Sequence, residues 1–123
     1  MARLLAIATI ACLSSGGALA ATDATHGAKL FKSRCGACHS AKQGGPAIMG
    51  PTLYGVVGRP AASVPGFSYS KAMKASGITW SDDKLTAYLP APQTLVHGTK
   101  MAFAGLKQPG DVADVVAYLD TLK

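Results

Sequence analysis

The segment Cys35-Gly36-Ala37-Cys38-His39 constrains this chain of 123 residues more than any other feature of its sequence. It has the C-x-x-C-H spacing of a c-type haem attachment site. Residues three and four apart share one face of a helical turn, so two thiols and an imidazole can face one flat ligand together. The thiols can form thioethers with the two vinyl groups of a haem, and His39 can then bind the iron as its proximal ligand. The motif therefore predicts one covalently attached haem.

Three interpretations of the cysteine pair involve no haem. A thioredoxin-like redox pair needs a nearby βαβ pattern, and no apolar strand precedes Cys35. A structural zinc site needs four ligands in two separated pairs, and residues 21–123 contain no second cysteine pair. The third alternative is a chance match, because a motif of five residues is short. The rest of the chain favours haem.

The first twenty residues have the features of a secretory signal peptide. Arg3 supplies the positive charge, residues 4–13 form an apolar run, and Ala18-Leu19-Ala20 is an A-x-A cleavage site. The apolar run is shorter than the ~20 residues that a membrane span needs. We therefore expect residues 1–20 to be cleaved and residues 21–123 to form one monohaem domain in the periplasm.

Two alternatives concern the same segment. Lipidation of Cys12 would need a lipobox, and Thr9-Ile10-Ala11 is a poor one. Retention as a membrane anchor would need a tether, and the first helix is expected to begin almost at once. Cleavage would remove Cys12 and leave Cys35 and Cys38 in an oxidising compartment, where disulfides are expected. The two form either a short disulfide or two haem anchors, and His39 favours the anchors.

The charge of the chain indicates the kind of partner. The formal net charge is +6, with 12 basic residues against 6 acidic ones. A basic exported protein can bind nucleic acid, a membrane surface or an acidic protein. The basic residues are dispersed rather than gathered in the runs typical of nucleic-acid tails. We expect a monomer that binds acidic proteins, with no nucleic acid and no stable membrane insertion.

The hydrophobic pattern predicts an all-α chain of short helices and long loops. A first helix is expected over residues 24–34, capped by Thr22, Asp23 or Thr25, with His26 solvated at its start. Helical turns are expected over 69–76, and a short helix after Ser81 that Pro90 and Pro92 stop. The last helix is expected to begin at Asp111, after a loop over 94–108.

A second long loop is expected between residues 41 and 67, where glycines and prolines break any regular element. A disordered linker fits poorly because the segment contains many apolar side chains. Irregular segments of this length in compact domains are usually functional. A loop wrapped around a cofactor would explain both its length and its apolar side chains.

The residues alone leave the sixth iron ligand open. Met49 follows His39 closely and is expected on the same side of the haem, and Met73 is expected in the core. Met101 lies in a distant loop that can reach the opposite face. His97 is its rival, although a loop histidine is most often a surface residue and a methionine most often fills the core.

With His39 and Met101 both in view, the chain resembles the class I cytochromes c, close to the mitochondrial type and its bacterial relatives. The resemblance extends over nearly all of residues 21–123, and its blocks are highly specific when taken together. These blocks are residues 35–39, 50–59, 66–70, 77–80, 88–89, 98–105 and 114–119.

The resemblance implies the cytochrome c fold around one haem c held through Cys35 and Cys38, with His39 and Met101 as axial ligands. It implies that the Pro51 carbonyl accepts a hydrogen bond from the proximal imidazole. It also implies a crossing of the first and last helices at Gly27, Phe31, Val115 and Tyr118. The other implied haem contacts are Arg59, Tyr69 and Trp80 at one propionate, Tyr88 and Thr99 near the methionine sulfur and the other propionate, and Phe103 at the exposed haem edge.

A haem with both axial positions filled suits one-electron transfer rather than catalysis. The resemblance therefore implies a soluble electron carrier, not an enzyme, that serves respiratory or photosynthetic complexes. Candidate partners are quinol-oxidising cytochrome complexes, terminal oxidases, reaction centres and dehydrogenases. The alternative is a haem enzyme or gas sensor, such as a small peroxidase, with a labile sixth ligand.

A basic ring is expected to steer acidic partners to the haem edge near Cys38 and Phe103. Its expected members are Arg34, Lys42, Lys100 and Lys107. Two departures from the family pattern bear on the redox potential. His97 stands where the family usually has proline, and Met73 stands where an asparagine is common.

Overall fold

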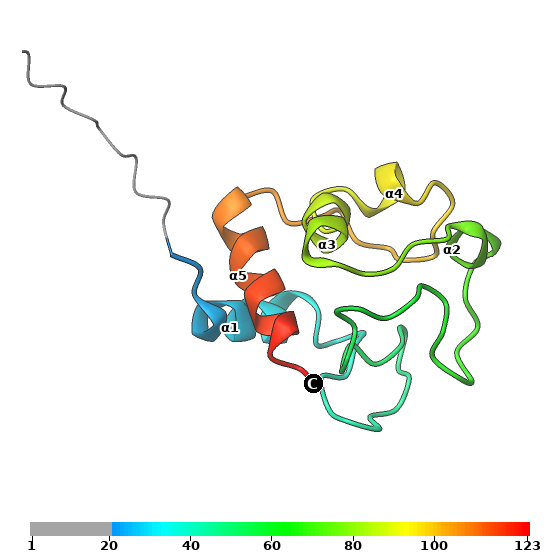
Figure 1. Cartoon of the computed structure of the whole chain (residues 1–123), viewed down its shortest axis with the longest axis horizontal. Helices are drawn as coiled ribbons and strands as arrows, with labels where there is room; N and C mark the ends of the chain where they lie inside the picture. Colours follow the sequence, from blue (N-terminus) through cyan, green and yellow to red (C-terminus); the bar gives the residue numbers. More distant parts are fainter. Residues whose placement is uncertain (1–20) are drawn as a thin grey trace, which may run out of the picture.

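The computed structural model describes residues 21–123, which form five helices joined by long loops (Figure 1). The helices are α1 (Ala24–Arg34), α2 (Lys71–Ala75), α3 (Asp82–Tyr88), α4 (Pro92–Leu95) and α5 (Pro109–Asp120). Extended pairing within this part of the chain is limited to one isolated antiparallel bridge, Pro60 with Thr79. The all-α prediction is confirmed. The predicted signal segment, residues 1–20, lies outside the described residues.

Side-chain caps fix the starts of the first three helices. The Asp23 carboxylate caps the N-terminus of α1 by accepting a hydrogen bond from the His26 backbone N–H at 3.0 Å. Ser81 caps α3, as predicted, by accepting from the Lys84 N–H at 3.2 Å. Ser70 caps α2, so this helix is shorter than the span predicted for it. These oxygens satisfy N–H groups that have no partner inside the helix.

The helix after Ser81 stops before Pro90, as predicted, because α3 ends at Tyr88. Two other predictions at prolines are wrong: residues 92–95 form α4, which was not expected, and α5 begins at Pro109 rather than at Asp111. Both prolines occupy the first position of their helices. Proline is favoured there because the first N–H of a helix has no internal acceptor and the ring fixes a helical φ.

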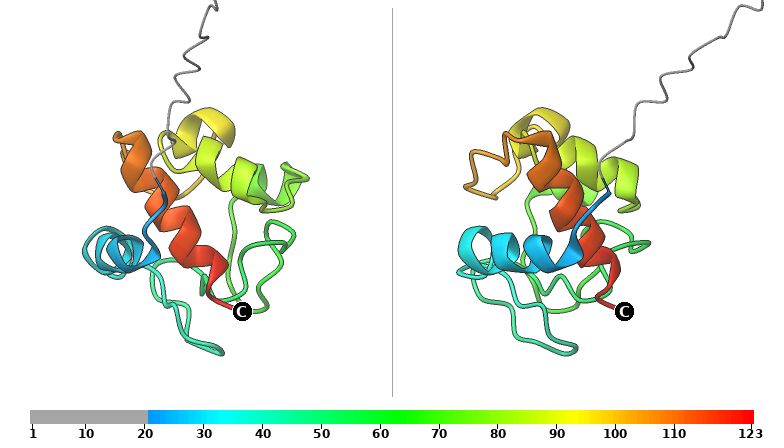
Figure 2. Two further views of the ribbon diagram at one scale, coloured as in Figure 1. Left: turned by 60° about the vertical axis from the view of Figure 1, so that its left-hand side comes forward. Right: turned by 90° about the vertical axis from the view of Figure 1, so that its left-hand side faces the viewer.

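The two terminal helices cross at close range (Figure 2). A Cβ atom at Gly27 would overlap the carbonyl oxygen of Asp114, so only glycine allows this approach. Beside it, the rings of Phe31 and Tyr118 lie 5.4 Å apart, and Val115 is 1% exposed. The crossing that the resemblance implied is therefore present. It fixes the position of the turn that follows α1.

The long loop over residues 41–67 contains no helix, as predicted, and is tied to the body of the molecule. The Leu53 N–H donates to the Ser40 carbonyl at 2.8 Å, and Val56 is buried in the core. In Figure 1 this loop forms the lower part of the molecule, opposite α3 and α4. Among the described residues, no helix has the length and apolar character needed to cross a membrane.

Candidate functional site

The C-x-x-C-H motif continues the path of α1 as one tight turn. Cys35 is the C-cap of α1, and its carbonyl accepts from the N–H groups of Cys38 and His39, both at 3.0 Å. The three side chains therefore come from a single turn, as the spacing predicts. Cys35 and Cys38 are free thiols, each partly buried, so neither is committed to a disulfide. This donor set fits the two thioether bonds of a haem c.

His39 is oriented through the ring nitrogen that faces the protein. Its Nδ1 lies 2.7 Å from the Pro51 carbonyl oxygen, the contact that the resemblance implied. A carbonyl can only accept, so Nδ1 carries the proton and Nε2 keeps a lone pair for a metal. Burial lowers the pKa of His39, against the opposing effect of the Pro51 bond, which favours the neutral ring that binds iron.

Gly50 supports the same ring, a role that the sequence did not reveal. A Cβ atom at this position would overlap the His39 imidazole, and the Gly50 N–H donates to the Cys38 carbonyl at 2.8 Å. The ring therefore packs directly on backbone. The Gly50-Pro51 pair was visible in the sequence as part of the resemblance, but nothing in it showed that the glycine contacts the histidine.

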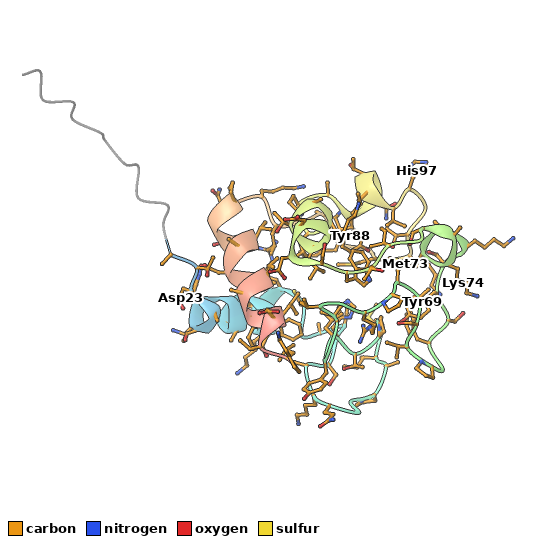
Figure 3. The ribbon with its side chains drawn as sticks, in the orientation of Figure 1. Asp23, Tyr69, Met73, Lys74, Tyr88 and His97 are labelled. Carbon is orange, nitrogen blue, oxygen red and sulfur yellow. The ribbon has the colours of Figure 1, made fainter. Side chains whose placement is uncertain are left out.

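Met101 lies among side chains from α3 and from its own loop. The Tyr88 hydroxyl is 3.4 Å from Met101 Sδ and 3.4 Å from Thr99 Oγ1, and Tyr88 comes from α3 (Figure 3). Burial raises the pKa of Tyr88, which outweighs the effect of its bond to Thr99, so the hydroxyl keeps its proton. It can donate that proton to the sulfur and orient the thioether. Thr99, 9% exposed, also accepts from the Met101 N–H at 3.4 Å.

Gln93 is a further residue at this loop that sequence reasoning missed. Its side-chain amide donates to the carbonyls of Thr99 at 3.0 Å and Met101 at 3.4 Å. One side chain of α4 therefore bridges the backbone on both sides of Lys100. The sequence carried no signal for this contact, because a glutamine followed by loop residues has no preferred partner.

The residues implied for a propionate lie around the buried part of the long loop. Arg59 donates to the carbonyls of Tyr54 and Thr52, both at 2.9 Å, and burial lowers its pKa. Trp80 is 7% exposed, and its backbone N–H donates to the Arg59 carbonyl at 2.9 Å. The guanidinium has five N–H groups, so donors remain that fit a carboxylate.

Tyr69 is the third residue implied for that propionate. Its hydroxyl accepts from the Val64 N–H at 3.1 Å, and its ring packs edge-on to Phe67 with centroids 4.8 Å apart. Among the charged and polar groups near Arg59, Tyr69 is the one that raises the guanidinium pKa against the effect of burial. The structure thus brings Arg59, Trp80 and Tyr69 into one region.

The four cations of the expected basic ring differ in how free they are. Arg34 is exposed, with its guanidinium 5.9 Å from the centroid of the Phe103 ring, and Lys42 is also exposed. The Lys100 ammonium donates to the Ser68 carbonyl and lies over the Phe67 ring. Lys107 donates to the carbonyls of Pro90 and Ala104, both at 2.7 Å. The two lysines therefore also hold loops in place.

The remaining ligand candidates lie in different surroundings. Met73 packs against the core, as expected. Met49 is 74% exposed, with its sulfur 3.8 Å from Cys38 Sγ, and so lies beside the attachment turn. His97 is exposed and points outward in Figure 3. Of the three methionines Met49, Met73 and Met101, Met101 is the one whose sulfur lies 3.4 Å from a hydroxyl donor.

Comparisons with known proteins agree with this arrangement. The sequence profile described as Cytochrome c matches residues 24–123. A protein named "Cytochrome c" from Euglena viridis is 50% identical over 101 residues, which cover 82% of this chain and 98% of that protein. Proteins of the same name from Arabidopsis thaliana (49% over 98 residues; 80% and 88%) and Theileria parva (50% over 97 residues; 79% and 84%) are also similar.

The turn of thiols, the imidazole with its free nitrogen and the matched profile all lead to one assignment. The chain belongs to the cytochrome c family: it is an electron-transfer protein rather than an enzyme, and it carries one haem c bound covalently through Cys35 and Cys38.

Proposed function

We propose that the protein is a soluble periplasmic carrier of single electrons whose iron is held between His39 and Met101. When bound, haem c supplies an iron that gains and loses one electron. In each cycle the protein takes one electron from a reduced donor complex and passes it to an oxidised acceptor, without making or breaking a bond. The donor is a quinol-oxidising complex or a dehydrogenase, and the acceptor is a terminal oxidase or a reaction centre.

The contact between Tyr88 and Met101 carries this proposal. A carrier needs both axial positions filled, so that no substrate reaches the iron and little moves when the electron arrives. The Tyr88 hydroxyl 3.4 Å from the sulfur holds the thioether in one orientation, as the Pro51 carbonyl does for the imidazole on the other side. A soft thioether ligand also raises the redox potential.

Sequence features support the location and the partners. Residues 1–20 have the pattern of a cleaved export signal, and the family profile begins at residue 24. The net charge of +6 and the exposed cations Arg34 and Lys42 favour acidic partners. The His97 and Met73 departures alter the surroundings of the site and therefore the exact potential.

The visible absorption spectrum of the purified holoprotein tests the ligation. We expect sharp low-spin bands in both oxidation states and the weak far-red band of sulfur bound to ferric iron. A high-spin ferric spectrum would contradict the proposal and support an enzyme or sensor with an open iron. A low-spin spectrum without the far-red band would place His97 or a lysine on the iron, and His97→Asn then distinguishes these two.

Mass spectrometry of the protein recovered from a periplasmic extract tests the location. We expect a mature chain that begins at Ala21 and carries one haem. A chain that retains Arg3, or one that is lipidated at Cys12, would contradict cleavage and favour a membrane-bound carrier. Recovery of the holoprotein from the cytoplasm alone would contradict export.

A further inference from the structure

The three methionines of residues 21–123 differ in how far they are open to solvent. Met49 is 74% exposed on the long loop, whereas Met73 and Met101 are partly buried and pack against the core. A dissolved oxidant converts a methionine to its sulfoxide most readily where the sulfur is accessible. Exposure therefore makes Met49 the methionine that such an oxidant meets first.

The electron pairs of the Met49 sulfur are also free to react. Cys38 Sγ lies 3.8 Å from this sulfur, and once a haem is attached, Cys38 is a thioether with no proton to donate. Met101 Sδ, in contrast, lies 3.4 Å from the Tyr88 hydroxyl, and in the proposed carrier it gives an electron pair to the iron. A sulfur whose electron pairs are engaged is a weaker nucleophile. Accessibility and reactivity thus favour the same residue.

A sulfoxide at Met49 would leave the fold intact. The Ile48 N–H donates to the Gly50 carbonyl at 3.1 Å, and the Gly50 N–H donates to the Cys38 carbonyl at 2.8 Å, so backbone hydrogen bonds flank this residue. Because the side chain is exposed, the polar oxygen of a sulfoxide would face water. The same oxygen on Met73 or Met101 would enter the core, where an unpaired polar group is costly. The structure thus tolerates oxidation at Met49 better than at the other two methionines.

We propose that Met49 is a sacrificial oxidation site that reacts with hypochlorous acid and related two-electron oxidants ahead of Met101. The inference rests on the proposed function only for the ligation of Met101. In the reaction, the O–Cl bond of the oxidant breaks and an S–O bond forms on Met49. Sulfur loses two electrons and chlorine gains them, so the products are the sulfoxide, chloride and a proton. A methionine sulfoxide reductase then restores the thioether, with two thiols oxidised to a disulfide and the oxygen released as water.

The test treats the ferric holoprotein with hypochlorous acid in increasing amounts, up to about three molar equivalents. Peptide mass spectrometry measures the fraction of sulfoxide at each methionine, and the far-red band reports whether Met101 is bound to the iron. Met49→Leu removes the reactive sulfur and keeps the approximate size of the side chain. Met73→Leu is the matched control, because it removes a methionine that is partly buried.

At about one equivalent of oxidant, we expect the parent to carry about fivefold more sulfoxide at Met49 than at Met73 or Met101, with its far-red band unchanged. Met49→Leu should accumulate sulfoxide at Met101 and lose the far-red band at a lower dose than the parent. Met73→Leu should behave as the parent does. A methionine sulfoxide reductase supplied with a dithiol should restore the thioether of Met49, because the side chain is exposed.

Other outcomes would overturn the inference. Sulfoxide that forms equally or first at Met73 or Met101 would show that exposure does not direct the oxidant. Chlorination of lysine side chains while Met49 stays intact would assign the reaction with the oxidant to amines. Loss of the far-red band at the same dose in the parent and in Met49→Leu would show that Met49 does not protect Met101. A parent that lacks this band before treatment would contradict the proposed function, and the order of oxidation in the peptide map would then decide the inference by itself.

Discussion

The two sides of the haem site are built in different ways. On one side, His39 belongs to the turn that carries both cysteines, and its neighbours Gly50 and Pro51 are close in sequence. On the other side, Met101 is held by Tyr88 from α3 and by Gln93 from α4, through hydrogen bonds of 3.0–3.4 Å. The first side is local and packed on backbone, whereas the second depends on contacts between separate elements. We therefore expect the contacts on the Met101 side to break before those on the His39 side when the protein is destabilised.

The largest effect should come from Met101→Ala, which removes one side altogether. Because the cysteines and His39 lie on the other side, the variant should keep its covalent haem. The far-red band should vanish, and the redox potential should fall by a sizeable part of the ~0.8 V that axial ligands span. Spectroscopy and potentiometry measure both. Loss of the haem from this variant would show that haem attachment on the His39 side depends on the Met101 side.

Gly50→Ala tests the packing on the histidine side. The new methyl group would overlap the His39 ring, so the ring or the loop has to move. We expect a loss of about 1–3 kcal/mol in the free energy of unfolding, measured with guanidinium. Gly110→Ala is the control, because a Cβ there meets no atom within 4 Å. Equal stability of the two variants would show that the histidine side is less tightly packed than described.

Gln93→Ala weakens the methionine side alone. It removes the two hydrogen bonds to the carbonyls around Lys100, which are together worth about 1 kcal/mol. The pH at which the far-red band disappears should fall by about 0.5–1 unit. Gln43→Ala, in the exposed long loop, should leave this pH unchanged. If both variants behave like the parent, the loop of Met101 is held without α4.

The smallest effect, a change in Tm, should come from His26→Gln, which belongs to neither side of the haem site. His26 Nδ1 lies 2.8 Å from Asp114 Oδ2, and Asp114 Oδ1 also accepts from the Asp23 N–H at 2.7 Å. The hydrogen bond to Asp114 raises the pKa of His26, and the bonds from Asp23 and His26 lower that of Asp114.

These directions fix the pH window. A raised histidine pKa stabilises the fold below about pH 6.5, and this contribution is lost as the pH rises through the folded value. A lowered carboxyl pKa stabilises the fold above about pH 4 and is lost as the pH falls. The difference in Tm between parent and variant should therefore be largest between about pH 4 and 6.5. A difference that does not vary with pH would contradict an ionic contact.

Local sequence made the histidine side of the site predictable, whereas Met101, Tyr88 and Thr99 on the other side could be assigned only through the family resemblance. The C-x-x-C-H turn and α1 could be predicted because spacing and hydrophobic periodicity determine them, and the His39–Pro51 contact was implied by the family resemblance. Gln93 could not be predicted, because its partners are set by how α4 is placed in three dimensions. For the same reason the tethering of Lys100 and Lys107 to carbonyls was missed, and the exposed His26 was not linked to Asp114. The two helix-initiating prolines were misjudged because a proline marks both the end and the start of helices.

The crossing of α1 and α5 has a consequence for the order of biosynthesis. Among the described helices, α1 has its contacts with α5 alone, and Gly27 allows them. A ribosome or a secretion channel releases the chain from its N-terminus, so the turn with both cysteines emerges before the segment of α5 can pack on α1. Its thiols stay accessible to an attachment enzyme throughout that interval. Packing of α5 on α1 would then complete the fold after a haem had been attached to that turn.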